Sequence, residues 1–514
     1  MRFCSASQAV AAIADGATVL VDGSGGGVNE PGAVLAALRQ RFADQAQPAN
    51  LTLVHVSGMG SGHDDGADYF ASRGMVRRVI GGHWAWGRGM QELAADEDLQ
   101  AYCLPQGTIS HLLRDIAAGR PGHLSRVGLG TFVDPRMEGG RLNESAAEPI
   151  NQIVNIGGEE FIFTPAFPID VAIIRATTAD EDGNLTMEGE GLFAETLASA
   201  QAAKNSGGIV IAQVRQAVPR HSIPANSVRV PGVLIDAVVV DPTQRLSFAT
   251  DRDRLLEGAH WSSEVSIPAI ALSERKVIGR RAAAFLRHGD VVNLGFGMPD
   301  AVAAVLAEED LQDAVTFTVE QGHVGGVPAG GSDFGLARNH AASLDAGAQF
   351  DWYDGGGIDT AVLSFAEIDR RGNVNVSRFG RRMPGIGGFV NISQGARRVI
   401  FVGTFVAKGS WQVGEGAITL PQGGIHKLID SVQQVSFSAE QALRDGRPVV
   451  YVTERAVFEL TENGPRLIEI APGIDLQRDV LALMGFVPEI ADDLATMDTR
   501  LFTDAAMALQ LQHR

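Results

Sequence analysis

One arrangement of local features occurs twice in this sequence, and the repeat constrains the fold more than any other property of the chain. Residues 18–42 contain a β-branched run, then a cluster of glycines, then an amphipathic stretch rich in Ala and Leu. Residues 290–308 repeat that order. Strands that alternate with helices are typical of a mainly parallel sheet with helices on its faces. The repeat therefore predicts two related α/β units.

A second pair of segments supports the same duplication. Residues 170–186 and 359–375 align without a gap, and each contains an apolar run, the turn Asp-x-x-Gly-Asn and the start of another β-rich run. A turn of this composition between two apolar runs is typical of two strands joined by a short connection. We predict an α/β chain of two homologous domains, each built on an open, mainly parallel sheet.

The two halves differ in the spacing of the features that they share. Gly23 and Gly183 are 160 positions apart, whereas Gly295 and Gly372 are only 77 positions apart. The first half therefore carries additional residues, and we predict that most of them form an insertion near residues 83–159, where Gly, Pro, Arg and His are frequent.

The boundary between the halves is predicted from charge. Residues 251–254 and 273–276 are rich in charged side chains and poor in apolar ones, as linkers between domains often are. We place the N-terminal domain at 1–265 and the C-terminal domain at 275–514.

The charge of the chain limits its partners. The formal net charge is −19, and only four of the 514 residues are lysine. A surface this acidic repels the phosphates of nucleic acids and of anionic lipids, so neither nucleic acid nor membrane is an expected partner. An anionic small-molecule substrate would need arginines gathered locally around its site.

The sequence lacks the patterns that are typical of metal-binding sites and of secreted proteins. Two cysteines cannot build a disulfide framework, and the histidines are not spaced as a helical pair around a glutamate. The first 23 residues lack the continuous apolar stretch of a signal peptide. No window approaches the roughly 18 uninterrupted apolar residues that a membrane helix needs. We expect a cytoplasmic protein without a metal site.

Dinucleotide binding is the first functional reading to test, because glycine-rich loops twice follow a predicted strand. The loop that begins at Gly23 has Val28 where the fingerprint requires its third glycine, and no acidic residue closes a second strand about 20 residues further on. The loop at Gly295 fails in the same way. The glycines are better explained as sharp turns from a strand into a helix.

Residues 315–335 carry the strongest candidate for chemistry. A β-rich run ends at Glu320 and is followed at once by a loop with five glycines within residues 322–331. Ligands of open α/β folds bind at the carboxyl ends of strands, and glycines allow another molecule to approach the main chain closely. From these residues alone, Glu320 is either a reacting group or an ordinary hydrogen-bonded carboxylate.

Four glycine-containing motifs are distributed over both halves of the chain. The motifs are Glu320-Gln-Gly-His-Val-Gly-Gly-Val-Pro, Leu104-Pro-Gln-Gly-Thr, Pro384-Gly-Ile-Gly-Gly-Phe-Val-Asn-Ile and Gly23-Ser-Gly-Gly-Gly-Val-Asn-Glu-Pro. Together they resemble those of the family I coenzyme A transferases, in particular the single-chain acetate/propionate type (acyl-CoA:acetate/3-ketoacid CoA-transferases). The likeness extends from about Val19 to Phe502.

The resemblance implies a catalytic role for three residues. Glu320 would be the nucleophile that carries CoA as a thioester, while the side-chain amide of Gln106 and the backbone N–H of Gly388 would stabilise the oxyanions. Because Gln106 belongs to the first half and the other two residues to the second, we expect the active site in the cleft between the domains. Contacts to CoA are expected from five glycines. These are Gly325, Gly326, Gly385, Gly387 and Gly388.

The resemblance also implies the reaction and the partners. The expected reaction transfers CoA from a short-chain acyl-CoA to a carboxylic acid such as acetate by a ping-pong mechanism, with CoA as a substrate and no permanently bound cofactor. A homodimer or homotetramer is expected by the same resemblance. An acyl-CoA hydrolase using Glu320 with water is the alternative enzyme. A ligand-sensing regulator on a similar fold is disfavoured by the net charge.

The amino-acid sequence alone leaves two points open. Gln321 and His323 depart from the pattern beside the nucleophile, and His323 either lines the acyl pocket or faces solvent from a loop. Arg378, Arg381 and Arg382 are candidates for holding the phosphates of CoA by their position only, and a solvated turn is the alternative.

Overall fold

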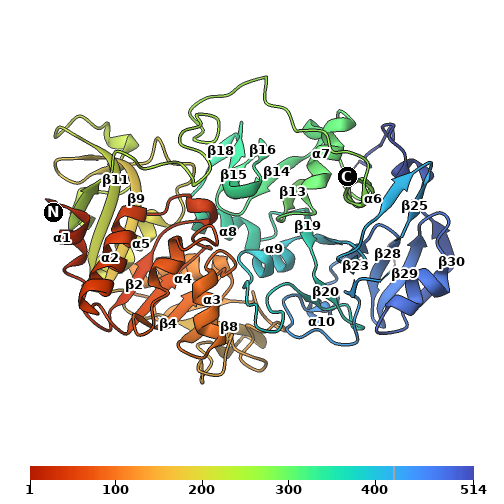
Figure 1. The fold of residues 1–514 in the computed structure, drawn as a ribbon, viewed down its shortest axis with the longest axis horizontal. Coiled ribbons are helices and arrows are strands. Elements are labelled where there is room, and N and C mark those ends of the chain that lie inside the picture. Colours follow the sequence, from red (N-terminus) through yellow and green to blue (C-terminus); the bar gives the residue numbers. More distant parts are fainter. Residues whose placement is uncertain (421–422, 514) are drawn as a thin grey trace.

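The computed structural model describes residues 1–420 and 423–513, which form two α/β halves lying side by side (Figure 1). The ten helices of these residues are α1 (Ala6–Val10), α2 (Gly32–Gln45), α3 (Arg88–Ala95), α4 (Gln106–Ala117), α5 (Thr196–Asn205), α6 (Glu274–Ala283), α7 (Asp300–Glu308), α8 (Ala346–Asp354), α9 (Phe389–Gly395) and α10 (Ala439–Arg444).

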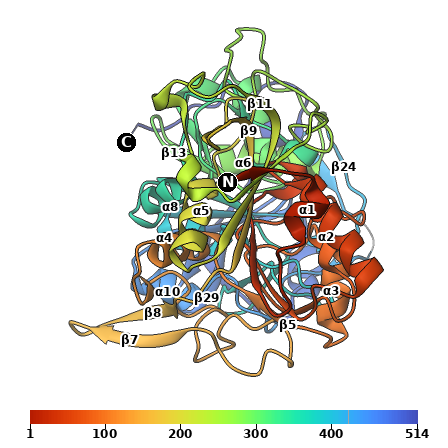
Figure 2. The same ribbon diagram turned by 90° about the vertical axis from the view of Figure 1, so that its left-hand side faces the viewer.

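The first half is built on one mainly parallel sheet in the order β1-β12-β11-β9-β2-β3-β4-β5, with β10 antiparallel to β9. The strands are β1 (Arg2–Phe3), β2 (Thr18–Val21), β3 (Leu51–His55), β4 (Val76–Gly81), β5 (Gln100–Cys103), β9 (Val171–Asp180), β10 (Leu185–Thr186), β11 (Ile209–Val218) and β12 (Ala237–Val240). Every residue of β9 is buried, as expected for a central strand covered on both faces. Figure 2 shows α1, α2 and α3 on one side of this half, with α4 and α5 on the other.

The second half is built on a sheet in the order β18-β15-β14-β13-β19-β22-β27-β28-β29-β30. The strands are β13 (Val291–Leu294), β14 (Thr316–Val319), β15 (His323–Val324), β18 (Ala342–Ser343), β19 (Thr360–Ser364), β22 (Arg398–Val402), β27 (Val449–Val452), β28 (Ala456–Thr461), β29 (Gly464–Ile470) and β30 (Glu489–Thr496). Four two-stranded pairs complete this half. They are β16 (Val327–Pro328) with β17 (Ala337–Arg338), β20 (Glu367–Ile368) with β21 (Val374–Asn375), β23 (Val406–Ala407) with β26 (Ile425–His426), and β24 (Gln412–Gly414) with β25 (Ala417–Thr419).

The same five-stranded parallel core is present in both sheets. The order β3-β2-β9-β11-β12 in the first half corresponds to β14-β13-β19-β22-β27 in the second, and all neighbours within each set are parallel. The halves differ outside this core. Beyond β3 the first sheet continues with the parallel strands β4 and β5, whereas beyond β14 the second continues with the antiparallel strands β15 and β18. The predicted fold class is confirmed.

A separate antiparallel sheet projects from the first half (Figure 2), in the order β6 (Gly122–Ser125), β8 (Glu159–Pro165) and β7 (Gln152–Ile156). It overlaps the stretch where the insertion is predicted. The main strands of the two halves lie within 2–240 and 291–496. The boundaries at 265 and 275, and the limits of the insertion, stay predictions.

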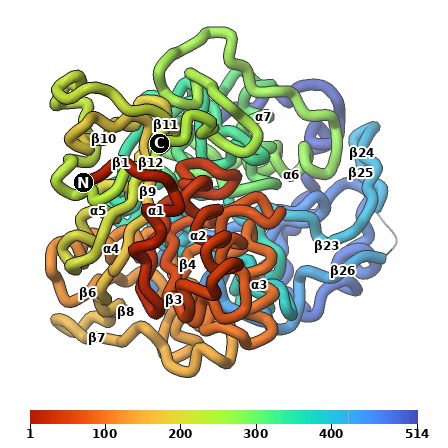
Figure 3. Tube along the Cα trace, turned by 60° about the vertical axis from the view of Figure 1, so that its left-hand side comes forward, coloured from red at the N-terminus to blue at the C-terminus, as the bar shows by residue number. Residues whose placement is uncertain are grey.

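The two halves share a hydrogen-bonded seam. The Trp84 N–H donates to the Pro384 carbonyl at 2.7 Å, and the Gly387 N–H donates to the Gly82 carbonyl at 2.7 Å. Ile386 of the second half is buried in the hydrophobic core of the first. The pairs β23–β26 and β24–β25 lie at the side of the second half away from α1 and α2 (Figure 3). None of the helices in the described ranges combines the length and apolarity that a membrane span requires.

Candidate active site

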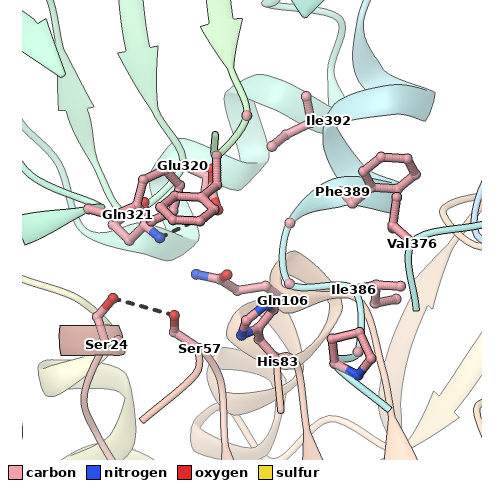
Figure 4. Close-up of a pocket in the computed structure, with 18 of the residues that line it drawn as sticks. Ser24, Ser57, His83, Gln106, Glu320, Gln321, Val376, Ile386, Phe389 and Ile392 are labelled. Atoms are coloured by element: carbon pink, nitrogen blue, oxygen red, sulfur yellow. Dashed lines mark hydrogen bonds between the residues drawn. The ribbon is translucent and has the colours of Figure 1, made fainter. Parts of the chain in front are cut away.

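A cavity of about 200 Å³ lies between the halves and receives side chains from both (Figure 4). Ser24 follows β2 and Ser57 follows β3 in the first half, and Glu320 follows β14 in the second. The carboxyl ends of parallel strands therefore face one another across the seam, which is where open α/β sheets bind ligands. The remaining lining residues include His83, Trp86, Gln106, Phe296, Phe334, Val376, Gly385, Gly387, Gly388, Phe389 and Ile392.

Among the residues that the structure describes, Glu320 is the one carboxylate that lines this cavity. Its side chain is buried, and only 9% of the residue is exposed. Burial raises its pKa from the ordinary value to about 7, and hydrogen bonds to its own backbone and to Gln321 and Asn293 oppose that rise. A carboxylate that is poorly hydrated and titrates near neutral pH is a stronger nucleophile than an exposed one, and such shifts are frequent at functional sites.

A buried polar network supports the strand end that carries Glu320. The Asn293 amide donates to the Thr318 carbonyl and to the Tyr353 hydroxyl, both at 3.2 Å. The Tyr353 hydroxyl donates in turn to the Thr318 hydroxyl at 2.7 Å, and the Gln349 amide donates to the Val319 carbonyl at 3.3 Å. Such a network restricts the backbone and side-chain positions at the end of β14.

The two predicted oxyanion donors lie beside this carboxylate. Gln106 is the first residue of α4, and Figure 4 shows its side-chain amide reaching into the cavity between Glu320 and the serine pair. Gly388 immediately precedes α9, and its N–H has no hydrogen-bond acceptor within the described ranges. A Cβ at position 388 would lie 3.3 Å from Glu320 Cγ, so the backbone passes the carboxyl group at contact distance because the residue is glycine.

The five glycines predicted to contact CoA separate into two groups. Gly385, Gly387 and Gly388 line the cavity. Gly325 and Gly326 lie in the turn between β15 and β16, outside the residues that line it, where they pack against the segment 338–341. Their contact with CoA stays a prediction.

Gln321 and His323 have different environments. Gln321 lines the cavity, and its amide Nε2 lies 3.4 Å from Glu320 Oε1. His323 is fully buried away from the cavity, with Nε2 at 2.7 Å from the Gly191 carbonyl and its ring stacked on His340 at 3.9 Å. Burial, together with His340, lowers the pKa of His323 to about 3, so the ring is neutral. It lies neither in the pocket nor in solvent.

The three candidate arginines lie outside the Glu320 cavity. Arg381 and Arg382 line a neighbouring cavity of about 470 Å³ together with Arg88. Arg381 forms an ion pair with Asp96 at 2.6 Å. Arg378 is 3.8 Å from a carboxylate oxygen of Glu138.

Several cavity residues were not anticipated from the sequence. The hydroxyls of Ser24 and Ser57 are 3.4 Å apart, and Phe296 meets Phe334 edge to face with ring centroids 5.0 Å apart. Burial lowers the pKa of His83 to about 4, so it offers a neutral imidazole. A polar residue inside an apolar run, as at Asn293, was the available signal for the supporting network. Nothing local marked the others.

The arrangement defines a class of protein. A buried carboxylate, a neutral amide and a backbone N–H surround one small cavity, and these are the parts that covalent acyl transfer through an oxyanion requires. No group of three or more His, Cys, Asp or Glu side chains in the described ranges is arranged to hold a metal ion. The fold and the lining of this cavity are compatible with an α/β enzyme that transfers acyl groups.

Comparison with known proteins identifies the family. Residues 3–241 match the coenzyme A transferase family model. The chain is 43% identical over 512 residues to the caffeate CoA-transferase of Acetobacterium woodii, covering 98% of both chains. It is 41% identical over 510 residues to the acetate CoA-transferase YdiF of Escherichia coli K12, covering 99% of this chain and 96% of that one.

The structures agree as well. The acyl-CoA transferase YdiF of E. coli O157:H7, solved as a thioester complex with CoA, superposes with a TM-score of 0.95 at 40% identity, covering 100% of this chain and 98% of that one. The chain belongs to the coenzyme A transferase family, and the resemblance found in its motifs is confirmed.

Proposed function

We propose that this enzyme moves CoA from a short-chain acyl-CoA to a free carboxylic acid, with Glu320 as the covalent carrier. The Glu320 carboxylate attacks the acyl carbonyl, the C–S bond breaks, and an acyl-glutamyl anhydride and CoA thiolate result. The thiolate then attacks the glutamyl carbonyl and releases the acyl group as a carboxylate. The remaining glutamyl-CoA thioester is resolved by the acceptor acid through the same steps in reverse, so the kinetics are ping-pong.

The presence of Glu320, Gln106 and Gly388 around one cavity carries this proposal. Each step passes through a tetrahedral oxyanion, and removal of one preset donor typically costs ~100- to 1,000-fold in rate. The neutral amide of Gln106 suits this role, because a cation at the same place would stabilise the resting carboxylate and weaken it as a nucleophile. The thioester complex of the YdiF relative supports the same intermediate.

The walls of the cavity favour transfer over hydrolysis. Phe296, Phe334, Phe389 and Ile392 give the cavity apolar surface. Water that reached the anhydride or the thioester would consume the acyl-CoA without transfer, and apolar walls lower its access. The relatives are named for acetate and for caffeate, so both a short aliphatic acid and an aryl acid belong among the acceptors to be assayed.

CoA is proposed as a substrate, with no cofactor held permanently. The cavity lined by Arg88, Arg381 and Arg382 is the proposed location for its phosphates, because it gathers arginines on an otherwise acidic chain. We further propose a cytoplasmic homodimer or homotetramer, the location being where acyl-CoA esters are made and used.

Intact-mass measurement after incubation with acyl-CoA tests the mechanism. A CoA adduct that maps to Glu320, is absent from Glu320→Ala and disappears when acetate is added would support it. Glu462→Ala, which removes an exposed carboxylate between β28 and β29, is the control that should keep the adduct. Undiminished turnover by Glu320→Ala would overturn the proposal. Continuous release of free CoA at the same rate with and without an acceptor acid, and no new acyl-CoA formed from that acid, would instead favour the hydrolase.

A further inference from the structure

The two proposed oxyanion donors come from different halves, and the helices that carry them meet directly. The backbone N–H of Gln106 donates to the Gly387 carbonyl at 2.9 Å. One residue further along α4, the Gly107 N–H donates to the side-chain Oδ1 of Asn391 at 3.1 Å. Asn391 lies on α9, three residues after Gly388. The separation of the donors is thus determined by contacts between α4 and α9.

Asn391 is held in one orientation from its other side. Its Nδ2 donates to both carboxylate oxygens of Asp354, the last residue of α8, at 3.0 and 3.1 Å. The Asn391 side chain is fully buried. A rotated amide would place its N–H groups against the Gly107 N–H and its oxygen against a carboxylate, so both partners enforce the same orientation.

A path of side-chain contacts returns to α4 through His111. His111 Nδ1 lies 3.8 Å from Asp354 Oδ2, and Nε2 lies 3.0 Å from Asp351 Oδ1 and 3.2 Å from the Gly347 carbonyl. Burial raises the pKa of Asp354 to about 6, opposed by its hydrogen bonds from Asn391 and by His111. The contacts form a closed ring of α4, α9 and α8.

Further charged or titratable groups contact His111 or its neighbours. The ring of His123 is centred 5.0 Å from that of His111 and contacts Asp115 at 3.1 Å. Arg114 pairs with Asp351 at 2.5 Å. Burial lowers the pKa of both histidines, while the neighbouring carboxylates oppose that change.

The helices α4 and α9 are tightly packed where Gly107 meets Asn391. A Cβ at position 107 would lie 2.4 Å from Asn391 Nδ2 and 2.7 Å from a ring carbon of Phe350. Glycine is therefore required at position 107 for α4 and α9 to approach this closely, and a change in the Asn391 side chain moves one helix against the other.

We propose that Asn391, held by Asp354, is a positioning residue that sets the separation of the oxyanion donors Gln106 and Gly388. The inference rests on the proposed function of those donors. Donor geometry is effective only when both groups point at the developing oxyanion, and a displacement of ~1 Å in a reacting arrangement can cost ~100-fold in rate. Asn391 touches neither substrate nor Glu320, so it acts through the two helices.

An exchange of side chains tests the proposal. Asn391→Asp keeps an acceptor for the Gly107 N–H but sets two buried carboxylates against each other, and we expect kcat to fall ~10- to 100-fold with the KM for acyl-CoA changed less than ~3-fold. The double variant Asn391→Asp/Asp354→Asn restores a donor opposite the new carboxylate. It should recover at least ~5-fold of the lost kcat.

A pH series separates positioning from general loosening of the interface. As the pH falls from 8 to 5.5, the two carboxylates of Asn391→Asp can share a proton and regain a hydrogen bond, so the kcat ratio of this variant to the unmodified enzyme should rise. Glu138→Gln is the control, because it weakens a contact between the halves that lies outside α4, α8 and α9, the hydrogen bond from the Gln434 amide at 2.9 Å, and should leave kcat within ~2-fold.

The results of these measurements distinguish a failure of the positioning role from a failure of the proposed function. A kcat for Asn391→Asp within ~3-fold of the unmodified enzyme, or a double variant no better than the single one, would overturn the positioning role. A kcat ratio independent of pH would overturn it as well. If Glu320→Ala keeps its turnover, the proposed function itself fails. If Glu320→Ala is inactive while Asn391→Asp is not impaired, only the present inference fails.

Discussion

The burial of Glu320 should cost the protein stability that an isosteric amide recovers. Burial raises the pKa of this carboxyl from 4.5 to about 7, so the folded chain favours the protonated form more than the unfolded chain does. Each pKa unit corresponds to about 1.4 kcal/mol, and the difference therefore amounts to about 3 kcal/mol when the group is fully ionised. Glu320→Gln removes the charge and keeps the shape of the side chain.

The sign of this stability difference, and the pH range over which it develops, follow from the pKa values of Glu320 in the unfolded and the folded chain. Below about 4.5 the carboxyl is protonated in both states, so Glu320→Gln should differ little from the unmodified protein. The stabilising effect of the substitution should grow as pH rises from 4.5 to about 7 and then stay constant.

Denaturant unfolding of both proteins from pH 4.5 to 8.5 measures this difference, with Glu462→Gln as an exposed control that should show none. A difference for Glu320→Gln that does not change with pH would refute the reasoning, because it would mean that the ionised carboxylate is not penalised by the site. The ionised Glu320 carboxylate that destabilises the fold is also the proposed nucleophile. Glu320→Gln should therefore be more stable than the unmodified protein and show no turnover.

Three further predictions concern turnover. Gln106→Ala should lower kcat ~100- to 1,000-fold with a smaller change in KM, measured by steady-state transfer to acetate. Gly388→Ala, whose new Cβ would lie 3.3 Å from Glu320 Cγ, should keep the backbone N–H yet lower kcat ~10-fold, and the yield of the CoA adduct at a fixed time should fall with it. Phe296→Ala should widen the cavity mouth and raise the ratio of acyl-CoA hydrolysis to transfer, measured as free CoA released against new acyl-CoA formed from the acceptor; an unchanged ratio would count against the role of the apolar wall.

Local sequence patterns predicted the fold because they reflect local physics. The β-branched runs, the glycine turns and the repeated Asp-x-x-Gly-Asn segment each specify structure within about 20 residues, and their duplication was sufficient to predict two parallel-sheet halves. Glu320 could be proposed for the same reason, since a strand end followed by glycines is a local signal.

The parts that were not predicted depend on contacts between distant residues. The bond from Gly107 to Asn391 joins positions 284 residues apart, and the bond from His323 to the Gly191 carbonyl joins positions 132 apart. His323 illustrates the limit. Its place in a glycine-rich loop suggested solvent or the pocket, whereas packing against the first half and His340 buries it.

Strand register allows the two halves to be compared residue by residue. Val19 of β2 pairs with Leu53 of β3, and Val292 of β13 pairs with Phe317 of β14, while Val19 and Val292 occupy the same place relative to β9 and β19. The duplicated segments 170–186 and 359–375 support this register. The Asp170 carboxylate accepts the Thr18 N–H at 2.7 Å, as the Asp359 carboxylate accepts the Val291 N–H at 2.8 Å.

This register places Leu20 where the second half has Asn293, and Val56 where it has Glu320. The first half therefore shows that the fold is satisfied by apolar side chains at both positions. Buried polar groups must find hydrogen-bond partners or cost free energy, so the polar pair in the second half is not needed for the sheet to form. Because this polar pair, Asn293 and Glu320, lies beneath a cavity that both halves line, a catalytic role explains it best. The prediction that follows is that Asn293→Leu, which copies the first half, should be tolerated by the fold far better than by turnover, and equal losses of stability and activity would argue against it.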